Sequence, residues 1–126
     1  MKRIIYTENA PKAVGPYSQA VEINNTLYIA GQVPLNPGTM KVVEGGIEEQ
    51  TLQVLKNIGA ILEAAGYGFS DVVKSTCLLS DMKDFQAMNG VYQKFYPENP
   101  PARAAYAVKE LPLGVLVEIE TIAARG

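Results

Sequence analysis

The sequence has 126 residues, of which 48% are apolar and 19% are charged, and its formal net charge is −2. This composition is typical of a globular protein, and the length predicts one domain over residues 1–126. The charge balance argues against a nucleic-acid partner, because phosphate neutralisation needs a basic surface. No apolar run approaches the roughly 20 residues that span a bilayer. We therefore expect a soluble, cytoplasmic protein with no membrane partner.

The sequence contains no histidine and a single cysteine, Cys77. The absence of histidine excludes Ser-His-Asp and Cys-His catalysis and the usual zinc sites. The segment "VVKSTCLLS" predicts a buried strand, in which Cys77 serves as a small hydrophobic residue. Any chemistry must therefore use carboxylates, tyrosine, arginine, backbone amides and water.

The first third of the chain predicts three strands, at residues 3–6, 19–24 and 26–33. The last two meet at Asn24-Asn25, and asparagine tolerates the left-handed backbone of a tight hairpin turn. A Pro/Gly loop, "PLNPGTMK", follows at residues 34–41.

An amphipathic helix is predicted next, with Gly66 as its C-terminal stop. Apolar positions recur at steps of three and four residues, at Ile47, Thr51, Val54, Leu55, Ile58, Ile61, Leu62 and Ala65.

The rest of the chain predicts a strand at 72–79, a second helix, and strands at 102–108 and 115–124. Ser80 or Asp81 is a suitable N-cap for the helix. The segment "PENPP" ends the helix, and "KELPLG" is expected to join the last two strands as a hairpin. One helix face carries Phe85, Met88, Tyr92 and Phe95.

These elements predict an α+β fold, a mainly antiparallel six-stranded sheet with two helices on one face. The other sheet face still carries apolar side chains at alternating positions. No segment remains to cover it, so we expect a homo-oligomer whose sheets pack inward.

Arg103, in "PENPPARAAYAV", is a candidate ligand-binding residue because no acidic residue adjoins it on its predicted strand. It is either a surface or ion-paired residue, or a carboxylate clamp, for which the planar guanidinium is well suited. Ala105 and Ala107 share its strand face and leave room for a small anion.

Three further side chains are candidates, each with a structural alternative. Glu118 and Glu120 share one face of the last strand, either solvated or partly buried between apolar neighbours, which would raise a carboxyl pKa. Asn89 lies on the apolar stripe of the second helix, where it needs a hydrogen-bond partner. Tyr17 follows a Gly-Pro turn and either packs on the domain or forms a pocket wall.

The predicted hairpin creates a geometric conflict. It places Arg103 opposite Thr121 and puts Glu118 on the other face of the sheet. Either a bulge shifts the register, or Arg103 and Glu118 meet across a subunit boundary.

Five segments in order, "ENAPKAVGPYSQAV", "AGQVPLNP", "DMKDFQAMNGVYQKFY", "PPARAAYAVKELP" and "VEIETIAA", resemble the RidA/YjgF family of imine deaminases over essentially the whole chain. The resemblance implies a chorismate-mutase-like (YjgF-like) fold and a homotrimer with pockets at the subunit clefts. It implies hydrolysis of 2-iminopropanoate and 2-iminobutanoate, which are released by pyridoxal-phosphate-dependent dehydratases, to 2-keto acids and ammonia. The resemblance implies that this reaction needs no cofactor and no metal.

The resemblance also implies roles for individual residues. Arg103 matches the carboxylate-binding arginine, Glu118 the acid that positions or activates water, and Glu120 a second acid. The implied substrate-binding set is Arg103, Tyr17, Asn89, Ala105, Ala30 and Gly31. Ala30 and Ala105 depart from the commonest pattern, which has a hydroxyl or thiol there, although the backbone N–H of Ala105 can still bind substrate.

Two other functions remain open on the sequence. One is an endoribonuclease or translation inhibitor, an activity attributed to some family members. The net negative charge and the lack of histidine argue against it. The other is a trimer that binds small carboxylates without turnover.

Overall fold

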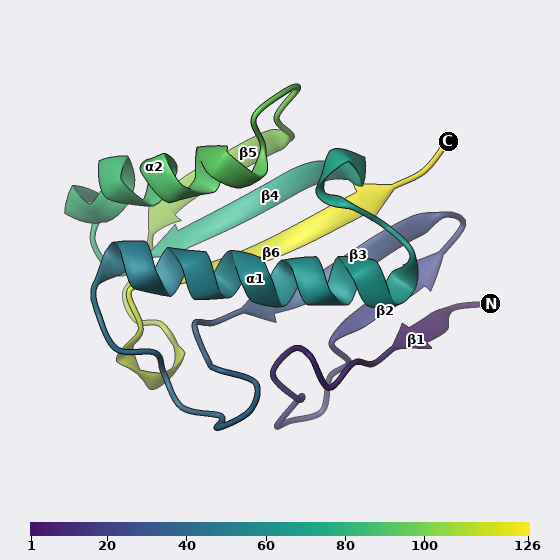
Figure 1. The fold of residues 1–126 in the computed structure, drawn as a ribbon, viewed down its shortest axis with the longest axis horizontal. Helices are drawn as coiled ribbons and strands as arrows, with labels where there is room; N and C mark the ends of the chain where they lie inside the picture. The colour runs from purple at the N-terminus through teal and green to yellow at the C-terminus, as the bar shows by residue number, and fades with distance from the viewer.

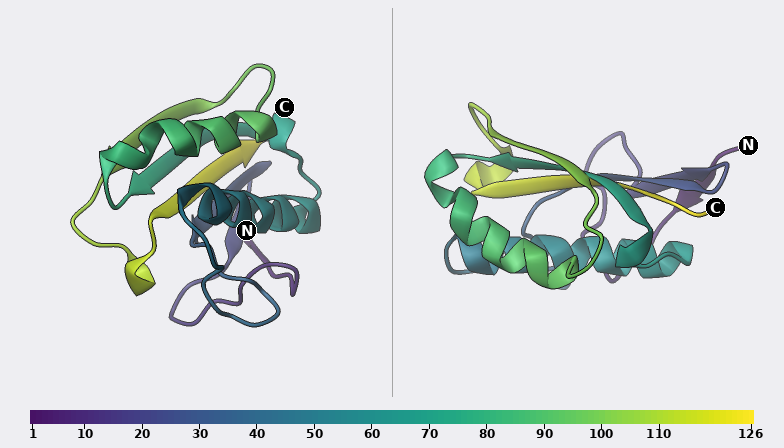
Figure 2. Two further views of the ribbon diagram at one scale, coloured as in Figure 1. Left: turned by 60° about the vertical axis from the view of Figure 1, so that its left-hand side comes forward. Right: turned by 90° about the horizontal axis from the view of Figure 1, so that it is seen from above.

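The computed structural model describes all 126 residues and contains six strands and two α-helices, joined by loops and short 3-10 turns. Both helices lie on the same face of a single sheet, and no helix covers the other face (Figures 1 and 2). The strand order is β1-β2-β3-β6-β4-β5, with β4–β5 as the one parallel pair. The α+β prediction and its six-stranded sheet are thus confirmed. The elements are β1 (Arg3–Ile5), β2 (Ala20–Ile23), β3 (Thr26–Gln32), α1 (Ile47–Ala65), β4 (Val72–Leu79), α2 (Phe85–Phe95), β5 (Ala102–Ala107) and β6 (Val117–Ala124).

Local sequence explains the turn and stop that bound the most regular elements. The β2–β3 hairpin turns at Asn24 (φ 50°) and Asn25 (φ 58°), both left-handed as predicted. Helix α1 ends at Gly66, whose φ of 84° is the left-handed conformation that glycine adopts without a steric penalty. The apolar stripe of α1 packs on the sheet, as its spacing predicted.

The start of α2 lies later than predicted. Asp81 Oδ1 accepts a hydrogen bond from the Lys83 N–H at 2.8 Å, but it caps a 3-10 turn over Met82–Asp84 rather than the α-helix. The α-helix itself begins at Phe85.

The predicted hairpin between the last two strands is wrong. Strand β5 pairs in parallel with β4, and β4 lies between β5 and β6. The chain leaves β5 through a 3-10 turn, Pro112–Gly114, and returns on the far side of β4. Burial explains this order. Alternate residues of β6 are buried apolar or small side chains, which suits a central strand, whereas β5 has no buried residue and suits an edge.

The sheet face opposite the helices carries exposed or half-buried apolar side chains. The register places Tyr28 beside Ile122 and Leu78 beside Tyr106 on this face, and Tyr28 and Tyr106 are 48% and 50% exposed. No helix in the structure combines the length and apolarity that crossing a bilayer requires.

Candidate functional site

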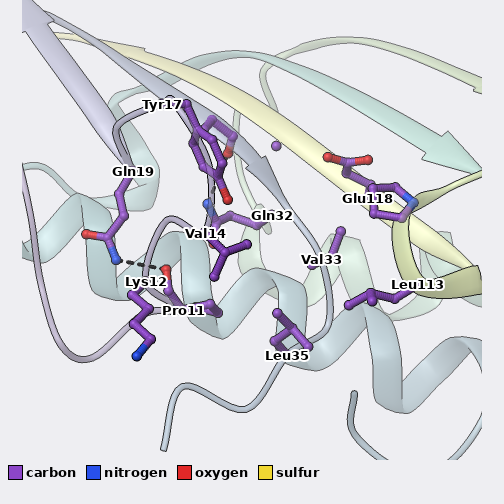
Figure 3. Close-up of a pocket in the computed structure, with 13 residues that line it drawn as sticks. Pro11, Lys12, Val14, Tyr17, Gln19, Gln32, Val33, Leu35, Leu113 and Glu118 are labelled. Carbon is purple, nitrogen blue, oxygen red and sulfur yellow. Dashed lines mark hydrogen bonds between the residues drawn. The ribbon is translucent and has the colours of Figure 1, made fainter. Parts of the chain in front are cut away.

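Six of the eight predicted site residues fall into two separate pockets. We call the first the Glu118 pocket, a cavity of about 500 Å³ whose lining includes Tyr17, Ala30, Gly31 and Glu118. Figure 3 shows Tyr17 and Glu118 on opposite sides of it. The second, the Arg103 pocket, has a volume of about 880 Å³. It lies between α2, the Pro-rich segment 97–101 and the start of β5, and its lining includes Asn89, Tyr92 and Arg103.

The carboxyl group of Glu118 is partly shielded from water. Glu118 lies on the open face of the sheet, where its neighbour on β4 is Leu78. Burial raises its pKa, and the negative charge of Glu120 raises it further. Partial burial, inferred from the apolar neighbours in the sequence, is therefore confirmed.

Gly31 allows Glu118 to lie against strand β3. A Cβ atom at position 31 would come within 3.0 Å of Glu118 Cδ and closer still to a carboxylate oxygen. Only glycine leaves the carboxyl group in this position without a shift, so the structure gives a steric reason for this residue.

Sequence reasoning missed a buried amide that holds one wall of the Glu118 pocket. Gln19 is 3% exposed. Its Nε2 donates to the carbonyl oxygens of Thr7, Ala10 and Pro11 at 3.0, 3.3 and 2.9 Å, and its Oε1 accepts from the Thr7 N–H at 2.7 Å. The bond to Pro11 is drawn in Figure 3. Gln19 thus fixes the loop that leads to Tyr17.

Two more buried amides, both on α1, hold the other walls. Asn57 Nδ2 donates to the carbonyl oxygens of Val33 and Leu35 at 3.2 and 3.0 Å. Gln50 Oε1 accepts from the Leu116 N–H at 2.8 Å, next to the start of β6. The polar interruptions in the apolar stripe of α1 were the only sequence signal for these contacts.

Arg103 has no acidic partner anywhere in the chain. The ion pairs of the structure involve only Arg3 and Arg125, both with Glu22. Arg103 Nη1 donates instead to Asn89 Oδ1 at 2.7 Å. This contact supplies the partner that Asn89 was predicted to need, and it leaves the charge of the guanidinium unneutralised.

Ala105 and Glu120 line neither pocket. Ala105 pairs with Cys77 on β4 and packs against the core. Cys77 is fully buried, and burial raises the pKa of its thiol to about 11, so it is the neutral core residue predicted from the sequence. Glu120 is exposed on the open face beside Thr76.

Arg103 and Glu118 lie on opposite faces of the sheet. Arg103 pairs with Ser75, which is buried beneath the helices, whereas Glu118 pairs with Leu78 on the open face. The register shift in β4–β6 lies between Val72 and Lys74 and does not affect the pairs from Lys74 to Leu79. A bulge therefore does not bring the two residues together, and one chain does not unite them.

The structure is thus an α+β protein with two separate pockets, one beside an arginine at the sheet edge and one beside a partly shielded carboxyl group on the open face. The chain matches the family model described as Endoribonuclease L-PSP over residues 7–125. It therefore belongs to this family, the RidA/YjgF family that its sequence resembles.

Individual relatives agree with this assignment along the whole chain. A RutC family protein of Pyrococcus horikoshii is 57% identical over 98% of both chains. The 2-iminobutanoate/2-iminopropanoate deaminases of mouse and human are 51% and 48% identical over 100% of this chain and 93% and 92% of theirs.

Solved structures extend the similarity to the fold. The crystal structure of RidA from an Antarctic Psychrobacter bacterium is 48% identical, with a TM-score of 0.94 over 98% of this chain and 99% of that one. Escherichia coli TdcF, crystallised with bound serine, is 36% identical, with the same TM-score and coverage.

Proposed function

We propose that this protein hydrolyses small 2-imino acids, such as 2-iminopropanoate and 2-iminobutanoate, to 2-keto acids and ammonia. The observation that carries the proposal is the un-neutralised guanidinium of Arg103 in an open pocket. An arginine without an acidic partner is suited to bind the carboxylate of a small acid bidentately. The names of the mammalian relatives and the serine bound by TdcF support this ligand class.

A complete site in this proposal combines the Arg103 pocket of one protomer with the Glu118 pocket of a neighbour in a homotrimer. Three features support it: the two residues lie on opposite sheet faces, β5 is an edge strand, and the open face is uncovered. Covering the open face with other copies also removes its exposed apolar side chains from water. Light scattering is expected to give a trimer mass, and a monomer would refute this arrangement.

Arg103 and Glu118 have different tasks in the reaction. Arg103 holds the substrate carboxylate and orients the C=N carbon, while Tyr17, Asn89 and the Ala30-Gly31 backbone enclose the substrate. Orienting two reactants in this way lowers the activation barrier by several kcal/mol. Because small imines already hydrolyse quickly in water, the reaction does not require a large further rate enhancement.

Glu118 acts as general base and then as general acid. As the water oxygen bonds to the imine carbon, Glu118 takes the proton that the water loses. It gives that proton to the nitrogen as the C=N double bond becomes single, which yields a carbinolamine. It then takes the hydroxyl proton of the carbinolamine and passes it to the nitrogen as the C–N bond breaks, so that ammonia leaves with a 2-keto acid. The raised pKa of Glu118 suits a group that must take up and then give back a proton, because burial and the charge of Glu120 both stabilise its protonated form relative to that of an exposed carboxyl group.

A coupled assay tests the activity directly. A pyridoxal-phosphate-dependent dehydratase generates the imine, and loss of its ultraviolet absorbance is followed with and without this protein. We expect faster loss with the wild type and none beyond background with Arg103→Ala. Glu118→Gln should lower kcat by about 10²-fold or more. Unchanged decay with the wild type would refute the activity.

Mixed trimers test the shared site. Arg103→Ala chains alone are expected to be inactive, and Glu118→Gln chains alone to keep only their strongly lowered kcat. Co-expressed with different tags and purified on both, they should form trimers in which some clefts pair an intact Arg103 with an intact Glu118. Every trimer that carries both tags has two chains of one variant and one of the other, so roughly a third of its clefts are complete. No recovery above the single variants would show that the residues do not act together across the boundary.

An endoribonuclease is the second candidate, because the matching family model carries that description. The net charge of −2 and the absence of histidine disfavour it. RNA degradation by a clean preparation, lost in Arg103→Ala, would reverse the order of the two candidates. Tight binding of 2-keto acids without imine turnover would instead indicate a non-catalytic binding trimer.

A further inference from the structure

Three side chains of α2 surround the guanidinium of Arg103. Phe85, Asn89 and Tyr92 are spaced four and three residues apart, so they share one side of the helix. Arg103 Cζ lies 5.4 Å from the ring centroid of Phe85 and 4.9 Å from that of Tyr92. With the hydrogen bond to Asn89, these contacts form what we call the neutral cradle: Phe85, Asn89 and Tyr92.

The cradle holds a cation without supplying a negative charge. Aromatic rings attract a guanidinium through their quadrupole, and the amide oxygen of Asn89 occupies only one of its five N–H donors. The other two arginines of the chain are held differently, since both form ion pairs with Glu22. A carboxylate beside Arg103 would orient it equally well but would compete with any acidic ligand.

Tyr92 contributes its ring rather than its hydroxyl. The side chain is buried, its hydroxyl has no hydrogen-bond partner, and its ring packs on Tyr96 with 4.7 Å between centroids. Packing on Tyr96 therefore fixes the ring of Tyr92 within cation–π distance of Arg103. Phe85 is only partly buried, so packing into the core accounts for only part of its position.

We propose that Phe85 and Tyr92 are positioning residues that orient Arg103 for carboxylate binding, and that the neutrality of the cradle keeps the guanidinium available to the ligand. The proposal rests on the carboxylate-binding role of Arg103 in the proposed function. It does not require imine turnover, because a bound 2-keto acid reports on it directly.

Ring-removing and ring-keeping variants test the positioning role. Tyr92→Leu and Phe85→Leu should each weaken the binding of pyruvate, measured calorimetrically, by about 3- to 30-fold. In the imine assay, KM should rise by the same factor, with kcat changed less than about twofold. Tyr92→Phe keeps the ring and should bind like the wild type. Equal loss in Tyr92→Phe and Tyr92→Leu, or no loss in either leucine variant, would overturn the proposal.

Asn89→Asp tests neutrality itself. The two side chains have nearly the same shape, so Arg103 should stay in place and the midpoint of thermal unfolding should not fall. Pyruvate affinity should nevertheless drop by about tenfold, because the new carboxylate forms an ion pair with the guanidinium and competes with the carboxylate of the ligand. Unchanged affinity in Asn89→Asp would refute the requirement for a neutral cradle.

Arginine side-chain NMR gives a readout that is independent of activity. The chain has only three arginines, so Arg103→Lys assigns the Nε–Hε resonance of Arg103. Ring currents from Phe85 and Tyr92 should displace that resonance, and each leucine variant should move it back while Tyr92→Phe leaves it. Pyruvate binding without imine turnover would refute the proposed reaction but would still support the role of the cradle in carboxylate binding. Absence of both pyruvate binding and ring-current displacement in the wild type would overturn the cradle.

Discussion

The two pockets hold their key side chains by different means. Arg103 is held by three side chains from one regular helix, α2, all within eight residues of sequence. Glu118 lies in a pocket whose walls include three irregular segments, each tied down by a buried amide from elsewhere in the chain. From this comparison we expect the orientation of Arg103 to tolerate changes outside α2 and β5, whereas the Glu118 pocket should depend on hydrogen bonds made across the whole fold.

Gly31→Ala should have the largest effect on the Glu118 pocket alone. The added Cβ would approach Glu118 Cδ to 3.0 Å, so the carboxyl group must leave its position. We expect kcat to fall by about 10²-fold, the contribution of a general base, while pyruvate binding by Arg103 changes little. Imine decay and calorimetry measure the two quantities.

Gly68→Ala is the matched control for this substitution. Its added Cβ meets no atom within 4 Å, and Gly68 lies outside both pockets. An equal loss of kcat in the two variants would show that the effect of Gly31→Ala is not a displacement of Glu118.

Gln19→Met should loosen one wall of the Glu118 pocket and leave the Arg103 pocket intact. The substitution keeps the volume but leaves buried backbone groups of Thr7, Ala10 and Pro11 without a partner. We expect a loss of about 2–4 kcal/mol in the free energy of unfolding, in line with buried groups that lose their hydrogen bonds. Denaturant unfolding measures this loss.

Hydrogen exchange then separates a local effect from a global one. Amides of residues 7–18 should exchange faster in Gln19→Met than the loss of global stability requires, while amides of α2 should follow global stability alone. Uniform acceleration throughout the chain would contradict a specific role for Gln19 in this wall.

The sequence predicted the regular elements far better than the irregular ones. The periodicity of α1 and the Asn24-Asn25 turn are local patterns, so they could be recognised without knowledge of the rest of the chain. The link from β5 to β6 could not, because "KELPLG" has turn residues that suit both a hairpin and a crossover. The burial of alternate β6 residues decides between the two, and burial is a property of the assembled sheet.

The candidate site follows the same division. Arg103, Asn89 and Glu118 stood out because a charged or polar group among apolar neighbours is visible in the sequence. Gln19 and Asn57 did not, because their partners are backbone carbonyls that the sequence does not mark. Phe85 and Tyr92 were placed only on the apolar face of the second helix, and their contact with Arg103 was missed, since an apolar stripe has the same spacing whether it meets a sheet or a guanidinium.

Glu120→Gln should shift the pH dependence of the reaction by a smaller amount. The negative charge of Glu120 is the second cause, after burial, of the raised pKa of Glu118. Without it, the pKa of Glu118 should fall, so the rise of kcat/KM with pH should move to lower pH. A pH profile of the imine assay in both proteins measures the shift, and a move to higher pH would exclude Glu118 as the base.

Glu22→Gln should have the smallest effect on activity and a clear one on acid stability. Glu22 accepts hydrogen bonds from Tyr67 at 2.6 Å and Arg3 at 2.9 Å and pairs with Arg125, at neither pocket. The bond from Tyr67, and then that from Arg3, lowers its pKa below 4.5. Its ionised form therefore stabilises the fold above that value, and this contribution is lost as pH falls through the lower, folded-state pKa.

The glutamine variant should accordingly unfold at a lower temperature than the wild type at pH 7, and the difference should shrink between about pH 5 and pH 3. Thermal unfolding followed by circular dichroism over this range measures it. Imine turnover at pH 7 should be unchanged, since Glu22 forms ion pairs with Arg3 and Arg125 and has no contact with Arg103. A difference in unfolding temperature that does not depend on pH would show that the contacts of Glu22 stabilise the fold through packing and not through its charge. Lost turnover would mean that the ion pairs of Glu22 affect Arg103.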